Sequence, residues 1–394
     1  MSYLDKYKVG APLVRTLSEG RSRWNALRNA IRYSHPAPTS IIGVRDYLKT
    51  AGSSCRYEKR SEASELVFPQ TDIEPEAARP LLEKTNRIEF PESFVLRVPD
   101  GRVLGDGTVV VAGNSILAES TTDFHRKQEH HYLLNERRVS QPERFDGRLA
   151  VITSPGSDNY FHGTLDSVPR VSLLAGLEDE IDGYYIDSQS RFHQEWLGML
   201  GIPENKIVSA SPERHIEAKE LIVPSFAGVS GLPSMEGLNF VAGFKPSTTN
   251  RDRRVYVSRA VARRRRIVNE NELLPLLERH GFETIRPGEL TVLEQMETFS
   301  SADVVVSAHG AELTNLAYCG AGAKVIELFS PYYLNPCFKQ LAAARGLRHA
   351  ALVGTGGKQI LREQTDAHHV WANIRIDLLK LKTTLATMLP SRAN

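Results

Sequence analysis

The sequence predicts an α/β protein with two domains, of which the second contains a parallel, doubly wound sheet. Strand-like and helix-like segments alternate between residues 149 and 225 and again between residues 254 and 353. The polar segment KPSTTNRD, residues 245–252, separates the two series and is typical of a linker. The chain of 394 residues is also longer than the roughly 250–300 residues that one hydrophobic core usually serves.

The first series belongs to an expected domain at residues 41–245. Between Ile41 and about Gly113, glycine and proline interrupt short apolar runs such as FVLRV and TVVVAG, which is typical of strands joined by hairpins. Strands are then expected at residues 149–153, 184–187, 206–210 and 220–225, and helices at residues 164–176 and 191–201.

The second series belongs to an expected domain at residues 246–365. Strands are expected at residues 254–259, 282–286, 303–308, 324–329 and 348–353, and helices at residues 269–281, 291–302, 309–318 and 335–346. Asn269 and Gly281 are placed to cap the first helix, and Thr291 with Glu294 forms a capping box at the second. Five strands joined by four helices through right-handed crossovers predict a parallel sheet with helices on both faces.

A last helix is expected within residues 366–394. Its apolar side chains recur on one face, at Val370, Ile374, Leu378, Leu381, Leu385 and Met388. Because such a face must be covered, we expect the helix to pack back on the first domain.

The first 40 residues are expected to form a basic helical extension. Trp24, Leu27 and Ile31 recur there at helical spacing among many Lys and Arg side chains. A helix of this kind can lie on an anionic membrane surface, here through residues 1–33, or dock on a partner. The alternative, a solvated helix packed on its own domain, is the more common case.

Composition disfavours several classes of partner and site. The 49 basic and 47 acidic side chains nearly balance, so the overall charge does not favour nucleic acid as a partner. Three unevenly spaced cysteines argue against a disulfide framework or a thiolate metal site. Because neither a signal-peptide pattern nor a run of about 18 apolar residues is present, we expect a cytoplasmic protein, with the inner face of the membrane as an alternative contact.

Residues 301–331, SADVVVSAHGAELTNLAYCGAGAKVIELFSP, are the most informative segment. An apolar strand delivers His309 and Gly310 to the start of a helix, where free backbone N–H groups favour an anion such as a diphosphate. Gly310 permits close approach of a ligand, and Asn315 lies about one turn into the helix. Taken alone, His309 would be a strand-end histidine with a satisfied hydrogen bond. Glu327 interrupts an apolar strand, and either ribose hydroxyls or a structural salt bridge could satisfy its carboxylate.

Arginines follow the first strand of the second domain. Arg259 and the run Arg263–Arg266 lie in a loop at the carboxyl edge of the expected sheet, where guanidinium groups can pair with phosphate oxygens. Arg259 is the more pointed candidate, because any single member of the run can equally be a solvated surface charge. RNA binding through the run is a further alternative, which one short run on a near-neutral protein supports weakly.

The first domain offers a candidate pair within SDNYFHGTLDSVPR, residues 157–170. His162 and Asp166 are four residues apart and share one face if the helix already includes His162. Asp166 could take the proton from an attacking hydroxyl while His162 positions the acceptor or the base, and the two roles could be exchanged. Alternatively, Asp166 only caps the helix.

Motifs for metals and for familiar cofactors are absent from the sequence. It has no D-x-D pair, Walker A loop, G-x-G-x-x-G fingerprint, H-x-x-E-H or C-x-x-C spacing. We therefore expect neither metal nor cofactor, and we expect arginines and a helix start to balance the charge of a leaving group.

Together these segments resemble glycosyltransferase family 61. The family's signature is a strand, then HGA, x-L-T-N-L, a glycine turn and V-I-E-L, and here HGAELTNL and KVIELFSP follow SRAVARRRRIVNENEL, PGELTVLEQM and SADVVVSA in that order. YFHGTLDSVPR resembles the family's aromatic-His-x-x-x-Asp-x-x-Pro-Arg block, and FHQEWLGMLGIPENKIV resembles the segment after it. The likeness covers about residues 145–335. Gly163, where many members have a bulky aromatic residue, and Glu312, where a glycine is common, depart from the pattern and are expected to alter acceptor or donor fit.

The resemblance implies a GT-B architecture of two facing Rossmann-like domains and an inverting transfer of sugar from a nucleotide donor, usually a UDP-sugar. Family members build capsular and other surface polysaccharides in bacteria and modify xylan or glycoproteins in eukaryotes, so the expected acceptor is a saccharide or a lipid-linked glycan. The roles carried over are diphosphate binding for Arg259 and Arg265, donor-pocket lining for His309, Gly310 and Asn315, ribose binding for Glu327, and general base for Asp166.

Two other classes of function remain open on the sequence. A nucleotide-sugar epimerase or a pyruvyl transferase could use the same architecture. A non-catalytic nucleotide-sugar-binding subunit of a polysaccharide assembly would bind UDP without transferring anything.

Overall fold

The computed structural model of the chain describes residues 34–52, 55–68, 87–121, 130–247, 250–356 and 372–389. The expected basic helix at residues 1–33 lies outside the described residues. The chain divides into two compact units: unit 1 comprises residues 1–62 and 92–230, and unit 2 comprises residues 63–91 and 231–394. None of the described helices combines the length and the apolar character needed to cross a membrane.

The core of unit 2 is a five-stranded sheet in which all neighbouring strands are parallel. Its spatial order is β18 (Phe282–Ile285), β17 (Arg253–Val257), β19 (Ala302–Ala308), β20 (Lys324–Phe329) and β21 (Arg348–Val353). This confirms the five expected strands and their parallel arrangement. The chain passes from β17 to β18 on one side and then crosses to β19 on the other. Ligands of such sheets bind beyond the carboxyl ends of the strands at this point of reversal.

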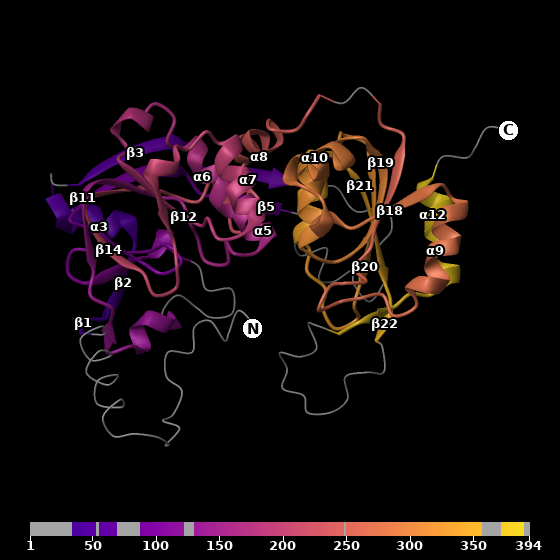
Figure 1. Cartoon of the computed structure of the whole chain (residues 1–394), viewed down its shortest axis with the longest axis horizontal. Coiled ribbons are helices and arrows are strands. Elements are labelled where there is room, and N and C mark those ends of the chain that lie inside the picture. The colour runs from indigo at the N-terminus through magenta and orange to yellow at the C-terminus, as the bar shows by residue number, and fades with distance from the viewer. Residues whose placement is uncertain are drawn as a thin grey trace, which may run out of the picture. The chain divides into compact units, whose positions relative to one another are not determined.

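Helices cover both faces of this sheet. α9 (Glu270–Arg279) and α12 (Leu378–Met388) lie on one face, and α10 (Val292–Ser300) lies on the other (Figure 1). The expected capping box of Thr291 and Glu294 is present at the start of α10. The other elements of unit 2 are β4 (Ser64–Val67), β5 (Arg87–Phe90), β16 (Leu232–Pro233), α8 (Met235–Ala242), η8 (Pro287–Glu289), η9 (Ala311–Tyr318), α11 (Cys337–Ala344), β22 (Thr355–Gly356) and β23 (Ile374–Arg375).

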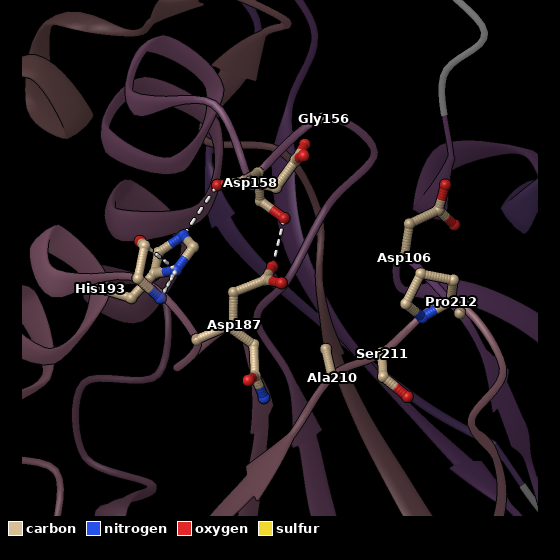
Figure 2. Close-up of a pocket in the computed structure, with 12 residues that line it drawn as sticks. Asp106, Gly156, Asp158, Asp187, His193, Ala210, Ser211 and Pro212 are labelled. Atoms are coloured by element: carbon tan, nitrogen blue, oxygen red, sulfur yellow. Dashed lines mark hydrogen bonds between the residues drawn. The ribbon is translucent and has the colours of Figure 1, made fainter. Parts of the chain in front are cut away.

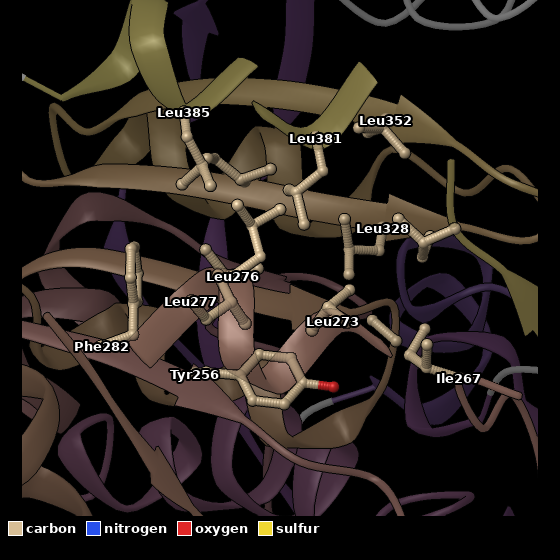
Figure 3. Close-up of a cluster of buried hydrophobic side chains, with 14 of the residues drawn as sticks. Tyr256, Ile267, Leu273, Leu276, Leu277, Phe282, Leu328, Leu352, Leu381 and Leu385 are labelled. Carbon is tan, nitrogen blue, oxygen red and sulfur yellow. The ribbon is translucent and has the colours of Figure 1, made fainter. Parts of the chain in front are cut away.

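The C-terminal helix packs on unit 2, so the expectation that it covers the first domain was wrong. Asp377 caps its first turn, and the helix therefore begins at Leu378. Ile374 is in an extended strand instead, because it bridges to Ile267. The apolar face of α12 meets the apolar face of α9 in one buried cluster (Figure 3), which includes Leu273, Leu276, Leu277, Leu381, Leu385 and Met388.

Unit 1 contains a ten-stranded mixed sheet. β11 (Glu143–Val151), β12 (Gly183–Ile186), β13 (Ile207–Ser209) and β14 (His215–Pro224) are parallel, in the spatial order β13-β12-β11-β14. They confirm the four strands expected between residues 149 and 225. The order reverses between β11 and β14, so the binding point of this sheet lies beyond Val151 and Pro224.

The remaining strands of this sheet are mostly antiparallel, as expected for strands joined by hairpins between residues 41 and 113, so the sheet is not the wholly parallel one that the family resemblance implies. Turns at Gly107 and Asn114, both with positive φ, are too short for the crossover that parallel neighbours need. β6 (Ser93–Pro99) and β7 (Arg102–Leu104) pair with β14, β8 (Thr108–Val111) with β7, β9 (Ser115–Leu117) with β8, β3 (Arg56–Ser61) with β6, and β2 (Ser40–Ile42) runs parallel to β9.

The segment between β11 and β12 is helical from Tyr160, four residues before the expected start. It consists of α5 (Tyr160–His162), a π-helical turn η5 (Gly163–Ser167) and α6 (Val168–Ser172). π-Helical turns are frequent at functional sites. The other elements of unit 1 are β1 (His35–Pro36), α3 (Val44–Ala51), η2 (Ala118–Ser120), η4 (Tyr132–Asn135), β10 (Arg138–Val139), η6 (Glu178–Glu180), α7 (Arg191–Met199), η7 (Glu204–Lys206) and β15 (Gly228–Val229).

Candidate active site

Two arginines lie at the point of reversal in the sheet of unit 2. Arg259 follows β17 and is buried, while Arg265 is partly buried with its guanidinium carbon 5.0 Å from the centre of the Tyr333 ring. Arg259 donates through Nη1 to the carboxylate of Glu312 and through Nη2 to the carbonyl of Arg264, at 3.2 Å. The Nε atoms of Arg259 and Arg265 are both buried, and neither has a hydrogen-bond partner among the described residues.

The electrostatics of this site favour an anionic ligand. Burial and, to a lesser degree, the nearby charge of Arg265 together lower the pKa of Arg259 to about 10. Burial likewise lowers the pKa of Arg265 below its ordinary value. Both guanidinium groups still carry their charge at neutral pH. Because Glu312 is the one carboxylate in contact with either arginine within the described part of the chain, a positive charge is left over for a ligand.

Gly310 allows this site to form. It connects β19 to η9, and a Cβ atom at this position would collide with the guanidinium group of Arg259. The sequence analysis expected close approach of a ligand at Gly310, and the structure adds that Arg259 itself uses the space. The expected short helix after Gly310 is present, but it is the 3₁₀ helix η9.

His309 and Glu327 form a buried hydrogen-bonded group with His349. His309 donates from Nδ1 to Glu327 at 2.5 Å, and His349 donates from Nε2 to the other carboxylate oxygen at 2.8 Å. These donors lower the pKa of Glu327 despite its burial, so the carboxylate is ionised. Burial lowers the pKa of His309, so its ring is neutral and its Nε2 is a hydrogen-bond acceptor. The carboxylate of Glu327 is fully buried and orients His309, which leaves it no access to a ribose.

Asn315 joins η9 to α10. Its side chain is fully buried, and its amide donates to Gln295 of α10 at 2.8 Å and to the carbonyl of Glu312 at 3.0 Å. The expected role of Asn315 in lining the donor pocket stays a prediction, whereas Arg259, Arg265, His309 and Gly310 do lie together.

The second expected pair, His162 and Asp166, lies at the point of reversal in the sheet of unit 1. His162 Nδ1 is 2.8 Å from Asp166 Oδ2, and the Ser230 hydroxyl donates to the same oxygen at 2.9 Å. The side chain of Asp166 is 0% exposed, whereas that of His162 is 21% exposed. Because Asp166 lies in the π-helical turn rather than at a helix start, it is not the helix cap that the sequence left open.

Arg170 fixes the position of this pair. It is fully buried and donates to the carbonyls of Thr153, at 2.7 Å, and Pro224, at 2.6 Å. Thr153 lies two residues after the end of β11 and Pro224 is the last residue of β14, so Arg170 joins the carboxyl ends of these two strands. Burial lowers the pKa of Arg170 to about 10, while the charge of Asp166 opposes that shift.

A cavity of about 250 Å³ opens in unit 1, at the carboxyl ends of β11, β12 and β13, and neither His162 nor Asp166 is among the residues that line it. Figure 2 shows Asp106 and Pro212 on one side of it and Asp187 and His193 on the other. Asp187 accepts hydrogen bonds from the hydroxyls of Thr153 and Ser157, and burial raises the pKa of Asp106 to about 6. The lining also includes Gly105, Gly156, Ser157, Asp158, Gln189, Ser190, Ala210 and Ser211, so it carries carboxylates and hydroxyls but no arginine or lysine.

Three residues of these sites were not predicted from the sequence: His349 and Tyr333 contribute to the arginine site, and Ser230 contributes to the pair in unit 1. Glu312, whose departure from the family pattern was expected to alter acceptor or donor fit, is in contact with Arg259. Ser230 had no signal in the sequence, because it lies 64 residues from Asp166 and only the fold brings them together. No group of three His, Cys, Asp or Glu side chains able to hold a metal ion occurs in the described part of the chain.

Comparison with known proteins bears on both sites. Residues 160–326, less than half of the chain, match the model of the family described as glycosyltransferase 61. A segment of 117 residues is 29% identical to an EGF domain-specific O-linked N-acetylglucosamine transferase of Drosophila melanogaster, and the match covers 29% of this chain and 22% of that protein. The chain thus spans about a fifth of the length of that relative. Together, the two matches support a relationship to glycosyltransferase family 61 and an enzyme that transfers sugar.

Proposed function

We propose that this chain is an inverting, metal-independent glycosyltransferase that transfers a sugar from a nucleotide donor, a UDP-sugar, to a hydroxyl of a saccharide or lipid-linked glycan acceptor. The family match supports sugar transfer in general. The observation that carries the donor is the pair of arginines, Arg259 and Arg265, whose buried Nε atoms have no partner in the described part of the chain. A cytoplasmic role in surface polysaccharide synthesis, with the two units in a GT-B arrangement, is part of the proposal.

The donor site is suited to a diphosphate. Guanidinium groups bind phosphate oxygens through paired N–H donors, and Arg259 and Arg265 keep such donors at the strand ends where ligands of these sheets bind. With Nδ1 committed to Glu327, His309 offers Nε2 as an acceptor. It would therefore accept from a hydroxyl or an N–H group of the donor rather than donate to phosphate.

Burial favours one of the two assignments of base and positioning residue that the sequence left open in unit 1. A general base must be within hydrogen-bond reach of the proton that it takes. Asp166 is fully buried and already accepts from His162 and Ser230, whereas His162 is partly exposed. We therefore assign the base to His162 and its orientation to Asp166, which holds the proton on Nδ1 and leaves Nε2 to accept.

The reaction is then a single displacement. His162 Nε2 takes the proton of the acceptor hydroxyl, and the oxygen forms a bond to the anomeric carbon. The bond from that carbon to the diphosphate oxygen breaks, and the electron pair leaves with the nucleotide. Arg259 and Arg265 balance the charge that develops there, as no metal is invoked. Attack opposite to the leaving group inverts the anomeric centre.

The acceptor would use the cavity in unit 1. The carboxylate and hydroxyl groups that line the cavity are of the kind that bind sugar hydroxyls. Ser157 lines the cavity, and its carbonyl also packs against Gly163. The departure at Gly163 has a structural reason: a Cβ there would lie 2.7 Å from the Ser157 carbonyl and 3.0 Å from the Phe192 ring. Because the relative is named as an N-acetylglucosamine transferase, that sugar is the first donor to test.

Calorimetric titration with UDP in the presence of EDTA tests the donor site. We expect the wild type to bind, and Arg259→Ala to weaken binding by roughly 30-fold, since a charge-assisted contact contributes about 2 kcal/mol. Arg279→Ala, which removes the same charge from an exposed position of α9, is the control. Binding that vanishes in EDTA and returns with Mg²⁺ would contradict the metal-independent site.

The rival functions predict different products. An epimerase would convert a nucleotide sugar to its isomer without any acceptor, and a pyruvyl transferase would transfer no sugar. A binding subunit would bind UDP without transfer, and changes at His162 or Asp166 would then have no functional effect.

A further inference from the structure

We propose that Glu312 is an internal counter-ion that holds the anion position on Arg259 and must leave when a diphosphate binds. The inference rests on the proposed function and concerns the regulation of affinity at the same donor site. Glu312 therefore weakens the binding of nucleotides in proportion to the negative charge of their phosphates.

The contact itself is direct. Glu312 lies in the first turn of η9, and its Oε2 accepts from Nη1 of Arg259. Arg259 has one other side-chain hydrogen bond, to the carbonyl of Arg264. Its Nε lacks a partner among the described residues, so Glu312 supplies the only negative charge that touches this guanidinium there.

Glu312 and a diphosphate would compete for the same place. A Cβ atom at Gly310 would collide with Arg259 and would lie 2.7 Å from Oε2 of Glu312. The carboxylate and the guanidinium are therefore in contact directly over the backbone of Gly310, at the start of η9 and at the end of β19. Glu312 engages Nη1 of the same guanidinium group whose Nε the proposed function gives to the diphosphate.

The two partners differ in their freedom to move. The side chain of Arg259 is 8% exposed and is tied to Arg264, whereas that of Glu312 is 26% exposed and has no side-chain bond besides the one to Arg259 in the described part of the chain. Glu312 can therefore turn towards water, while Arg259 cannot. When Glu312 turns away, no carboxylate of the described residues is in contact with Arg259 or Arg265. The phosphates of the ligand then take the place of Glu312.

Charge gives the inference its specific outcome. With Glu312 in place, two arginines face one carboxylate, and without it they carry two uncompensated charges. A carboxylate near the bound phosphates would also repel them. Removing its charge should therefore strengthen binding of a diphosphate and leave binding of the uncharged nucleoside unchanged.

The test compares Glu312→Gln with the wild type by calorimetry in EDTA, using UDP, inorganic pyrophosphate and uridine as probes. We expect the variant to bind UDP and pyrophosphate about tenfold more tightly, because the phosphates no longer have to displace a carboxylate, and to bind uridine as the wild type does. Without ligand, its melting temperature should fall, because Arg259 loses its counter-ion. Glu278→Gln removes the same charge from an exposed position of α9 and should change neither affinity.

The outcomes separate this inference from the proposed function. Equal or weaker binding of pyrophosphate by Glu312→Gln, or no binding to either form, overturns the inference. If neither form binds UDP but the variant binds pyrophosphate more tightly, the inference holds and the uridine donor is wrong. If Glu312→Gln does not fold, Glu312→Asp provides the second comparison: its shorter side chain loosens the contact with Arg259, and unchanged affinity for pyrophosphate would overturn the inference.

Discussion

The two candidate sites balance their buried charges in opposite ways. In unit 1, the carboxylate of Asp166 accepts from His162 and Ser230 and lies near the charge of Arg170. In unit 2, Arg259 and Arg265 have one carboxylate and two unpaired Nε atoms between them in the described part of the chain. A buried charge with a full set of partners is held for orientation, whereas an incompletely paired one is suited to receive a ligand.

The largest expected effect is on sugar transfer, and it tests whether Asp166 orients His162 in unit 1. His162→Ala should reduce sugar transfer by roughly 10²–10⁴-fold, because it removes the group that accepts the proton. Asp166→Asn keeps the shape but holds the proton on Nδ1 of His162 less firmly, so transfer should also fall, though less than in His162→Ala because the amide oxygen can still accept from Nδ1. UDP affinity should be unchanged in both. The measurement is turnover with a UDP-sugar panel and a matched acceptor, together with UDP affinity and melting temperature.

The ranking of the two variants is the informative result. If Asp166→Asn loses far more activity than His162→Ala, the carboxylate itself is the base, as the family resemblance implies. If both transfer sugar at nearly the wild-type rate, the base lies elsewhere and the pair is structural.

The contrast between the sites also marks what the sequence could predict. Alternating apolar segments and end signals such as Thr291 and Glu294 are local, and they predicted the parallel strands and most helices of both units. The arginines and His309 could be placed because they follow strands, and the strands of a parallel sheet share one carboxyl edge. A structural ionic contact was one of the two roles left open for Glu327, but its partners His309 and His349 could not be predicted, because they come from different strands and their rings meet only in the fold.

The C-terminal helix shows the same limit. Its apolar face was visible in the sequence, but the surface that covers it was not. Which face meets Leu381 and Leu385 depends on the position of α9, and only tertiary packing determines that.

A second expected effect is on stability, and it tests whether the donor site depends on the buried carboxylate of Glu327. Glu327→Gln should lower the free energy of unfolding by about 3 kcal/mol, because His309 and His349 lose a buried ionic acceptor. Its partners lower the pKa of Glu327, so this stabilisation is present at neutral pH and is lost as the pH falls through the acid range. The stability difference between wild type and variant should therefore shrink in acid.

Denaturant titrations at several pH values measure this difference. Asp303→Asn, which changes a partly exposed carboxylate of the same sheet, is the control and should cost much less. A difference that stays constant or grows in acid would show that Glu327 is not held ionised in the fold.

The smallest expected effect concerns the cavity in unit 1, and it sharpens the comparison by asking whether carboxylates there bind the acceptor. Asp187→Asn removes the charge but keeps the size of the side chain, and Asn can still accept from Thr153 and Ser157. Because Asp187 lines the cavity and is not the proposed base, we expect the KM for the acceptor to rise by roughly fivefold while kcat stays within about twofold of the wild type, the pattern of a contact made equally in ground and transition states. UDP affinity should not change, since the donor contacts lie in unit 2.

Asp179→Asn, which changes an exposed carboxylate of unit 1 outside the cavity, is the control and should change neither KM nor kcat. A fall in kcat with an unchanged KM would instead place Asp187 among the groups that position His162, and an unchanged KM and kcat would remove the cavity from the acceptor site.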